Sequence, residues 1–317
     1  MAANDDAGAG NEAAANDGGQ DGEKPVVLIT GCAKGGIGYE YCRAFSALGC
    51  RVVATDIPDR VPDLAADLAG DGEAAADDTL VLPLDVTSDA SVAAAVRRVL
   101  AEHGRIDVLV NNAGIGCTGP LAELPLDSVR RAMDVNFLGQ VRMVRAVAPH
   151  MASSSRGRGG RVVNVGSVVG TAATPWAAPY CASKAAVHAA TDALRLELRP
   201  FGVHVVKVVP GAVRSALGRA NAAALEAAGG RRREWEMYRE FAAAIEERAR
   251  ASQAGGATEA AAFARHVARK VMRPRPPREI VYGSMTLLFA ALAAAPAWAR
   301  DAFFARRFGL HGKKKMQ

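Results

Sequence analysis

The sequence predicts an α/β fold in which helices cover both faces of a parallel sheet. Short runs rich in Val, Ile and Leu alternate with stretches of helical length, and this alternation produces right-handed strand–helix–strand crossovers. The runs are apolar at successive positions, as expected of strands that are covered on both faces. Of the 317 residues, 50% are hydrophobic and 23% are charged, a composition typical of a globular protein with an ample core.

The expected elements fall in one domain over residues 25–283. The expected strands are 25–30, 51–55, 79–84, 106–110, 161–165 and 203–209, with a last strand at 280–283. The expected helices are 37–48, 88–102, 126–150 and 179–199.

The two ends of the chain differ in charge. Residues 1–24 contain six acids and one lysine, which predicts a disordered acidic tail without the apolar segment of a signal peptide. Residues 284–317 form a basic, amphipathic extension, and residues 263–317 contain twelve Lys or Arg and two acids. A basic end suits an anionic surface, and a solvated end is the alternative. Because the basic residues are not interleaved with stacking aromatics, we expect no nucleic-acid partner.

The cysteines argue against a disulfide framework. There are five, an odd number without CxxC or metal-like spacing, so we expect a reducing compartment and no metal site.

A glycine-rich turn follows the first expected strand. It reads Gly31-Cys32-Ala33-Lys34-Gly35-Gly36-Ile37-Gly38 and opens a helix. Glycines permit a tight turn and let the backbone approach a pyrophosphate, while the helix N-terminus offers N–H donors. The position predicts a Rossmann-type dinucleotide site that includes Gly31, Gly36, Ile37 and Gly38, and a mobile loop is the alternative.

Two residues point to different dinucleotides. Asp56 follows the second strand, where a carboxylate can accept hydrogen bonds from the adenine ribose and would repel a 2′-phosphate, which favours NAD(H). Lys34 could neutralise that phosphate, which favours NADP(H). A turn residue before Pro58 is the alternative for Asp56.

Candidate catalytic residues lie in the second half of the sheet. Tyr180 and Lys184 are four residues apart in an expected helix and share one face. A nearby ammonium stabilises a phenolate, and therefore makes tyrosine a usable acid or base. Ser167 follows a strand and could hold a substrate carbonyl. Asn136 is unusual inside a helix, and holding a water near Lys184 would explain it. Each residue by itself also has a structural interpretation: Tyr180 at the edge of the core, Lys184 as a surface charge, Ser167 in a turn and Asn136 at a helix kink.

Together these residues resemble the short-chain dehydrogenase/reductase family. The matching positions are Thr30-Gly31, Gly36-Ile37-Gly38, Asp85, Asn111-Asn112-Ala113-Gly114, Asn136, Ser167, Tyr180, Lys184 and Pro210-Gly211. The resemblance covers residues 25–215. It implies a seven-stranded sheet, NAD(P)-dependent ketone/alcohol interconversion, and a homodimer formed through helices 126–150 and 179–199.

The same resemblance implies a role for each position. Tyr180 would be the acid/base, Lys184 would bind the nicotinamide ribose and lower the tyrosine pKa, Ser167 would orient the carbonyl, and Asn136 would complete a proton relay. The remaining cofactor contacts would come from Asp85, Asn112, Pro210, Gly211 and Ser215, with Asn111 supporting the central strand.

Two departures narrow the resemblance. Gly35 and Gly36 are doubled in the turn, and the end of the chain runs Arg278-Glu279-Ile280-Val281-Tyr282-Gly283 before an apolar stretch. Both are similar to the 1-acyldihydroxyacetone-phosphate reductase group. That group implies a lipid ketone substrate, NADPH, and the cytoplasmic side of the endoplasmic reticulum or lipid droplet. We therefore favour NADP(H), with NAD(H) possible, and a soluble cytoplasmic protein is the alternative location.

Residues 212–278 are expected to form an insertion on the substrate side. Trp235, Tyr238 and Phe241 recur at a spacing that roughly shares one helix face. They would form either a lid over an acyl chain or a helix docked on the domain. Arg231, Arg232 and Arg233 would either reach a phosphate or remain solvated.

The uncharged run 280–299 is too short to cross a membrane once its strand is subtracted. An interfacial helix fits better, and a helix packed over the substrate mouth is the alternative. The residues expected to enter lipid are Leu287, Leu288, Phe289, Leu292 and Trp298, with Arg300, Arg306, Arg307 and 313–315 near headgroups.

The sequence thus favours a reductase of a small, lipid-like ketone. A steroid or retinoid alcohol dehydrogenase would use the same site. A catalytically silent, dinucleotide-binding protein of a membrane surface is the alternative from another class, and the complete set of Asn136, Ser167, Tyr180 and Lys184 argues against it.

Overall fold

The computed structural model describes residues 24–70, 79–153, 160–227, 235–253 and 255–311. The expected acidic tail, apart from Lys24, lies outside the described residues, as do Arg231, Arg232, Arg233 and 313–315.

A seven-stranded parallel sheet forms the centre of the molecule, in the order β3-β2-β1-β4-β5-β6-β9. The strands are β1 (Val26–Thr30), β2 (Arg51–Asp56), β3 (Thr79–Pro83), β4 (Val108–Asn111), β5 (Arg161–Val165), β6 (His204–Pro210) and β9 (Glu279–Tyr282). The Rossmann-type fold and its seven strands are therefore confirmed.

The strand order reverses beside β1. The chain moves outward from β1 through β2 to β3, and then crosses back to place β4 on the other side of β1. In such sheets the crevice outside the carboxyl ends of the strands, at the reversal, is where ligands bind. The fold therefore places a binding site beside the ends of β1 and β4.

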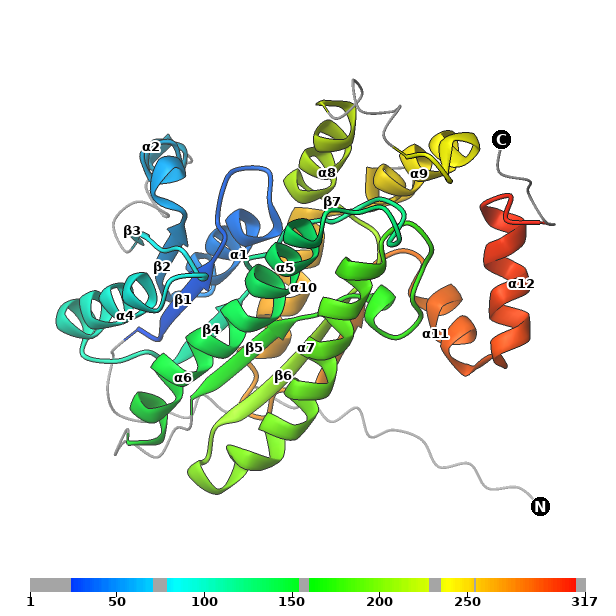
Figure 1. The fold of residues 1–317 in the computed structure, drawn as a ribbon. Helices are drawn as coiled ribbons and strands as arrows, with labels where there is room; N and C mark the ends of the chain where they lie inside the picture. The colour runs from blue at the N-terminus through cyan, green and yellow to red at the C-terminus, as the bar shows by residue number, and fades with distance from the viewer. Residues whose placement is uncertain (1–23, 71–78, 154–159, 228–234, 254, 312–317) are drawn as a thin grey trace, which may run out of the picture.

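Helices cover both faces of the sheet, with α4, α6 and α7 in front and α10 behind (Figure 1). The front helices are α4 (Asp89–His103), α6 (Gly139–Ala152) and α7 (Ala178–Glu197), and the rear face carries α1 (Ile37–Ser46), α2 (Val61–Gly70) and α10 (Ala260–Val271). Phe45 and Phe263 are fully buried on the rear face, and Met143 is fully buried on the front. Both faces of the sheet are therefore buried from solvent, as the continuous apolar runs predict.

The segment 212–278 divides between two locations. The helices α8 (Ala216–Ala227) and α9 (Ala242–Ala249) lie beyond the carboxyl edge of the sheet, with the short strand β7 (Val213–Arg214) pairing with β8 (Thr258–Glu259). In contrast, α10 packs on α1 as part of the core. The expected substrate-side insertion therefore ends before α10, because the last crossover needs a helix to cover the rear face.

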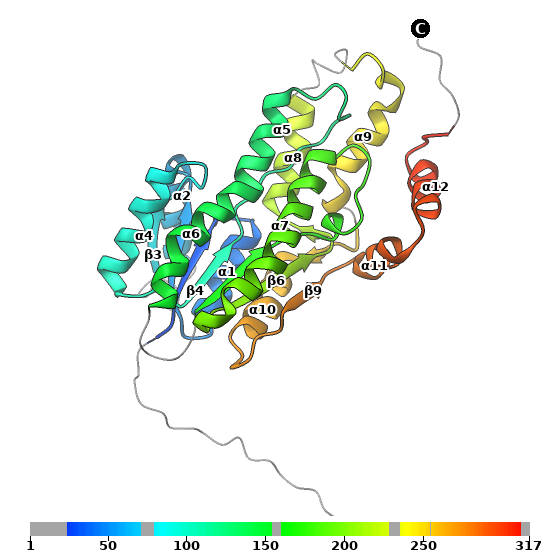
Figure 2. The ribbon, with the colours of Figure 1, turned by 60° about the horizontal axis from the view of Figure 1, so that its bottom comes forward.

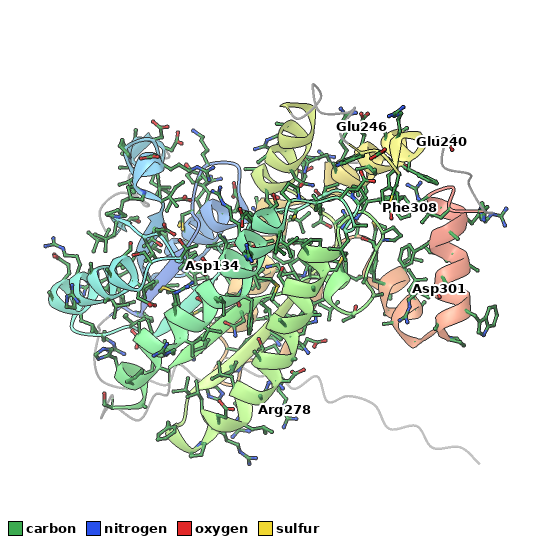
Figure 3. All side chains as sticks on the ribbon, in the orientation of Figure 1. Asp134, Glu240, Glu246, Arg278, Asp301 and Phe308 are labelled. Atoms are coloured by element: carbon green, nitrogen blue, oxygen red, sulfur yellow. The ribbon has the colours of Figure 1, made fainter. Side chains whose placement is uncertain are left out.

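The expected helix 126–150 contains an interruption. It consists of α5 (Leu126–Met133), a π-helical turn Asp134–Leu138, and α6. Asp134 marks this turn on the front helix layer (Figure 3). A π-helical turn inside a helix is often found at functional sites, and Asn136 lies in the middle of this one.

The apolar run near the end of the chain forms two helices. After β9 come α11 (Thr286–Ala294) and α12 (Ala297–Arg307), separated at Pro296. Figure 2 shows both on the side of the molecule where β9 lies, far from α2 and α4. Within the described ranges, no helix has the length and apolar character needed to cross a bilayer.

The side chains of α11 and α12 fit neither sequence-based alternative completely. Phe289 and Leu292 are buried in a cluster with Val168 and Trp176, so they do not face lipid as expected. Leu287 and Trp298 are exposed at 86% and 74%. The helix pair therefore packs on the domain through one face and leaves apolar side chains on the other.

Candidate active site

A cleft of about 1760 Å³ opens at the carboxyl edge of the sheet. Its walls come from the glycine turn, the ends of β4, β5 and β6, and the helices α8, α9, α11 and α12. One continuous space therefore joins the expected dinucleotide site to the segments that follow Gly211.

The glycine turn brings the N-terminus of α1 to this cleft. Gly31 has φ of +73°, a conformation that side chains strongly disfavour. A Cβ on Gly38 would lie 2.1 Å from the carbonyl oxygen of Gly31 and 2.6 Å from Nδ2 of Asn112. Gly36 is the N-cap, and Ile37 is the first residue of the helix. The backbone therefore packs too closely here for any residue but glycine at 38.

Asp56 supports the turn from the end of β2. Its Oδ2 accepts a hydrogen bond from the backbone N–H of Ala33 at 2.7 Å, and its Oδ1 accepts one from Ile57 at 2.9 Å. Lys34 lies on the outer side of the turn and pairs with Asp67 of α2 at 2.7 Å. Asp56 and Lys34 both line the cleft, but Lys34 has an acidic partner.

Asn112 and Asp85 organise the edge next to the turn. Asn112 Nδ2 donates to the carbonyl oxygens of Thr30 and Gly31, at 2.9 Å each, and so ties β4 to the turn. Asp85 Oδ1 accepts hydrogen bonds from the backbone N–H and the hydroxyl of Thr87. Both residues line the cleft. Asn111 is buried below them.

Asn136 is fully buried and bridges two segments. Its Oδ1 accepts a hydrogen bond from the backbone N–H of Ile115 at 2.8 Å, and its Nδ2 donates to the Ser183 hydroxyl at 3.0 Å. A Cβ on Gly114 would lie 3.2 Å from Asn136 Oδ1 and 3.8 Å from Lys184 Nζ. The absence of a side chain at Gly114 therefore lets Asn136 and Lys184 converge.

Lys184 lies beneath Tyr180 on α7. Its Nζ donates to the carbonyl oxygen of Val165 at 2.8 Å and lies 5.8 Å from the centroid of the Tyr180 ring. The side chain is buried, and burial lowers the pKa of Lys184 to about 8. The ammonium therefore remains charged at neutral pH.

The pKa of Tyr180 is raised overall. Burial, the largest influence, raises the pKa of Tyr180, while the positive charge of Arg248 and a hydrogen bond with Ser167 lower it. The phenol is therefore protonated at neutral pH, and Arg248 is a neighbour that the sequence did not reveal.

Ser167 is held by its own loop and by a buried histidine. Its hydroxyl accepts a hydrogen bond from the backbone N–H of Val169 at 3.4 Å, and its backbone N–H donates to Nε2 of His188 at 3.3 Å. Gly166 and Gly170 leave room for this imidazole, since a Cβ at either position would lie within 2.8 Å of the ring. His188, one turn after Lys184, carries no motif that could have revealed it.

Pro210, Gly211 and Ser215 also line the cleft. A Cβ on Gly211 would lie 1.9 Å from the carbonyl oxygen of Ser284, which explains a glycine there. The backbone N–H of Ala216 donates to the carbonyl oxygen of Gly35 at 2.6 Å. The N-terminus of α8 therefore contacts the glycine turn.

An aromatic cluster packs against Tyr180. Tyr238 and Phe241 pack on Trp176 with ring centroids 5.4 and 5.6 Å away. Trp235 and Tyr238 precede the helical residues, so the shared helix face predicted for them is wrong, although all three aromatics pack on the same cluster.

The fold and the glycine turn define a Rossmann-type protein with a dinucleotide cleft. Residues 25–226 match the family described as short chain dehydrogenase. The chain belongs to this family, and α9 to α12 lie beyond the matched residues.

Two relatives illustrate the range of the family. The chain is 37% identical over 201 residues to the short-chain dehydrogenase ptmH of Penicillium ochrochloron, covering 63% of this chain and 69% of that protein. It is 41% identical over 131 residues to a 3-ketodihydrosphingosine reductase of Bacteroides thetaiotaomicron, covering 41% of this chain and 48% of that one.

Two solved structures share the fold. A short-chain dehydrogenase from Streptomyces avermitilis is 27% identical with a TM-score of 0.67, covering 90% of this chain and 97% of its own. A gluconate 5-dehydrogenase from Burkholderia cenocepacia, solved with NADP and tartrate, is 33% identical with a TM-score of 0.56, covering 62% of this chain and 75% of its own.

Proposed function

We propose that this protein is an NAD(P)H-dependent reductase that converts a lipid-like ketone into an alcohol. The observation that carries the proposal is the arrangement of Ser167, Tyr180 and Lys184 in the same cleft as the glycine turn. Because one space includes both groups, a dinucleotide on the turn and a ketone beside Tyr180 could meet within it.

In the proposed reaction, Tyr180 donates the proton that the carbonyl oxygen gains. Its raised pKa keeps the phenol protonated at neutral pH, which suits a proton donor in the direction of reduction. Ser167 holds the carbonyl oxygen beside the phenol. When bound, a reduced nicotinamide supplies the hydride for the carbonyl carbon.

Lys184 and Asn136 would support the proton donor. The charged Nζ of Lys184 stabilises the phenolate that remains after proton donation and binds the nicotinamide ribose. Asn136, held by Ile115 and Ser183, would position a water that returns a proton to the site. The buried hydrogen bonds of Asn136 fix this geometry in advance.

The residues of the cleft fit a dinucleotide. Gly31, Gly36, Ile37 and Gly38 would hold the pyrophosphate, with Asn112 and Asp85 towards the adenosine. Pro210, Gly211 and Ser215 would hold the nicotinamide end. Gly31, Gly36 and Ile37 line the cleft at the N-terminus of α1, which supports this assignment because a helix N-terminus offers backbone N–H donors to an anion.

For the ribose end, the geometry favours NAD(H) over the NADP(H) that the sequence favours. Asp56 is 5% exposed and fixed by two backbone N–H groups at the cleft. Lys34 has its charge satisfied by Asp67, so it offers less to a 2′-phosphate. Arg60, 3.8 Å from Asp56, is the cation that could still reverse this preference.

The substrate is proposed to be amphipathic, such as 1-acyldihydroxyacetone phosphate. Leu288, Phe289, Phe303, Phe304 and Phe308 line the cleft and would contact an acyl chain. A steroid or retinoid ketone would suit the same apolar wall.

Two surfaces would serve partners. Leu126, Leu138 and Leu196 are exposed on or beside α5 to α7, where a second copy of the chain would cover them. Leu287 and Trp298 would contact the cytoplasmic side of the endoplasmic reticulum or a lipid droplet.

Turnover by the purified protein tests the proposal. We expect oxidation of NADH or NADPH, followed by its absorbance, with 1-acyldihydroxyacetone phosphate, steroid ketones or retinal. A higher kcat/KM with NADH would support the role of Asp56. Binding of the dinucleotide without turnover on any ketone would favour the catalytically silent protein.

A further inference from the structure

One arginine of the cleft belongs to a helix outside the family match. Arg248 lies in α9 and lines the same cleft as Tyr180. Its Nε donates a hydrogen bond to the hydroxyl of Thr174 at 2.8 Å, and Thr174 is 7% exposed. Because a buried partner holds one edge of the guanidinium, the side chain is fixed at the wall of the cleft.

Arg248 has no acidic partner among the residues that the structure describes. The adjacent Glu247 pairs with Arg307 of α12 instead. The guanidinium presents a planar fork of donors, and its two terminal nitrogens are available for an anion. A half-buried cation without a counter-ion is costly to maintain, so this position has an electrostatic reason to attract one.

The charge of Arg248 acts at the reacting end of the cleft. Its partner Thr174 lies 3.8 Å, Oγ1 to Sγ, from Cys181, the residue that follows Tyr180. The guanidinium is therefore anchored beside the segment that carries the phenol, and its positive charge lowers the pKa of Tyr180. An anion bound to Arg248 would therefore be near the carbonyl that Tyr180 protonates.

The wall beyond Arg248 is apolar. Phe304 of α12 and Phe308, which directly follows this helix, line the cleft and are buried at 7% exposure, and Phe308 lies at the end of α12 that faces α9 (Figure 3). A cation beside a row of aromatic rings matches a ligand with an acidic head and a hydrocarbon chain.

We propose that Arg248 binds an anionic group, a carboxylate or a phosphate, carried by the substrate near its ketone, while the chain of the substrate lies against Phe304 and Phe308. That the bound ligand is a substrate rests on the proposed reductase function. The anion site itself can be tested without turnover.

Binding measurements isolate the anion site. We expect calorimetric titration with decanoate and decyl phosphate to give an affinity about 10- to 100-fold higher for the protein than for Arg248→Met, because a hydrogen-bonded charge pair is lost. Decanol should bind both proteins equally. The stronger of the two anions identifies whether carboxylate or phosphate is recognised.

Two further variants make the result specific. Arg250→Met removes a charge from the exposed end of α9 and should change none of these affinities by more than about threefold. Arg248→Lys keeps the charge without the fork and should recover part of the anion affinity.

Equal loss of decanoate, decyl phosphate and decanol binding in Arg248→Met would overturn the anion site, as would unchanged affinities in all cases. In kinetic assays, kcat/KM should fall about 10- to 100-fold for 3-oxodecanoate or 1-palmitoyldihydroxyacetone phosphate, and by less than about threefold for the methyl ester or the dephosphorylated ketone. Selective anion binding without any turnover would contradict the reductase function and leave the anion site supported.

Discussion

The part of the molecule up to Gly211 and the part that follows it contribute to the same cleft by different means. In the first part, backbone groups shape the wall, as where the carbonyl oxygen of Gly31 accepts a hydrogen bond from Asn112. In the second part, side chains from α9, α11 and α12 shape the wall, as where Arg307 pairs with Glu247. The first arrangement uses positions that a short motif marks in the sequence, and the second depends on how helices without such a motif pack.

The difference suggests that the two walls serve different needs. The pyrophosphate is the same in NAD(H) and NADP(H), so a wall of backbone groups would suit it. A substrate differs between members, and a wall made of helices beyond the family match can change without disturbing the turn.

The largest expected effect lies in the part up to Gly211. Tyr180→Phe removes the proposed proton donor, and we expect kcat to fall about 10²- to 10⁴-fold, the usual worth of positioned proton transfer. Steady-state kinetics would measure this, with fluorescence titration showing an unchanged dinucleotide affinity. The matched control is Tyr282→Phe, because the ring of Tyr282 stacks on His266 on the rear face of the sheet. Similar losses of kcat in both variants would contradict the role of Tyr180.

The second prediction compares the stability of the C-terminal helices with that of the sheet. Phe304→Ala should lower the free energy of unfolding of the C-terminal helices by about 3 kcal/mol, because it removes a buried ring. Hydrogen exchange should show this loss in α11 and α12 and leave β1 to β4 protected. Loss of protection throughout the sheet would mean that the C-terminal helices and the sheet unfold together.

The part up to Gly211 and the part that follows it also differ in how much of each the sequence predicted. The strands, the glycine turn and the set Ser167, Tyr180 and Lys184 follow from short patterns, because apolar runs and fixed spacings are visible in one dimension. Even Asn136 gave a signal, since an amide inside a helix marked what is a π-helical turn.

The residues that were not predicted depend on packing. Arg248 lies in a run of Glu and Arg that resembles any solvated helix, and His188 resembles any polar residue of α7. Their roles arise only when α9 reaches Thr174 and α7 packs behind Ser167. The helix α10 was assigned to the substrate side for the same reason, since nothing local indicates which face of the sheet it covers.

The third prediction concerns pH and the support of Ser167. Burial, followed by the charge of Lys207, lowers the pKa of His188 to about 4 from 6.5. The unfolded chain therefore binds a proton below pH 6.5 that the folded protein excludes until about pH 4. The contribution of His188 to the free energy of unfolding is therefore fully present above pH 6.5. It decreases as the pH falls toward 4, by about 2 kcal/mol between pH 7.5 and pH 5.

Urea unfolding of the protein and of His188→Gln at both pH values would measure this contribution. The variant keeps an acceptor for the backbone N–H of Ser167 and should lose about 2 kcal/mol of the pH dependence, whereas substitution of the exposed His150 by Gln should not. Identical pH dependence in the protein and in His188→Gln would show that the buried imidazole does not resist protonation.

The last prediction tests the wall that the glycine turn forms. Gly38→Ala places a Cβ 2.1 Å from the carbonyl oxygen of Gly31, and forced overpacking of this kind costs about 1–3 kcal/mol. Gly70→Ala meets no atom within 4 Å and is the control. Because the turn must move to admit the methyl group, dinucleotide affinity should fall more than about tenfold in Gly38→Ala, while binding of decanoate near Arg248 remains. Loss of both ligands together would mean that the wall formed by the turn and the wall formed by α9 are not independent, and that the N-terminus of α8, which contacts Gly35, transmits the displacement between them.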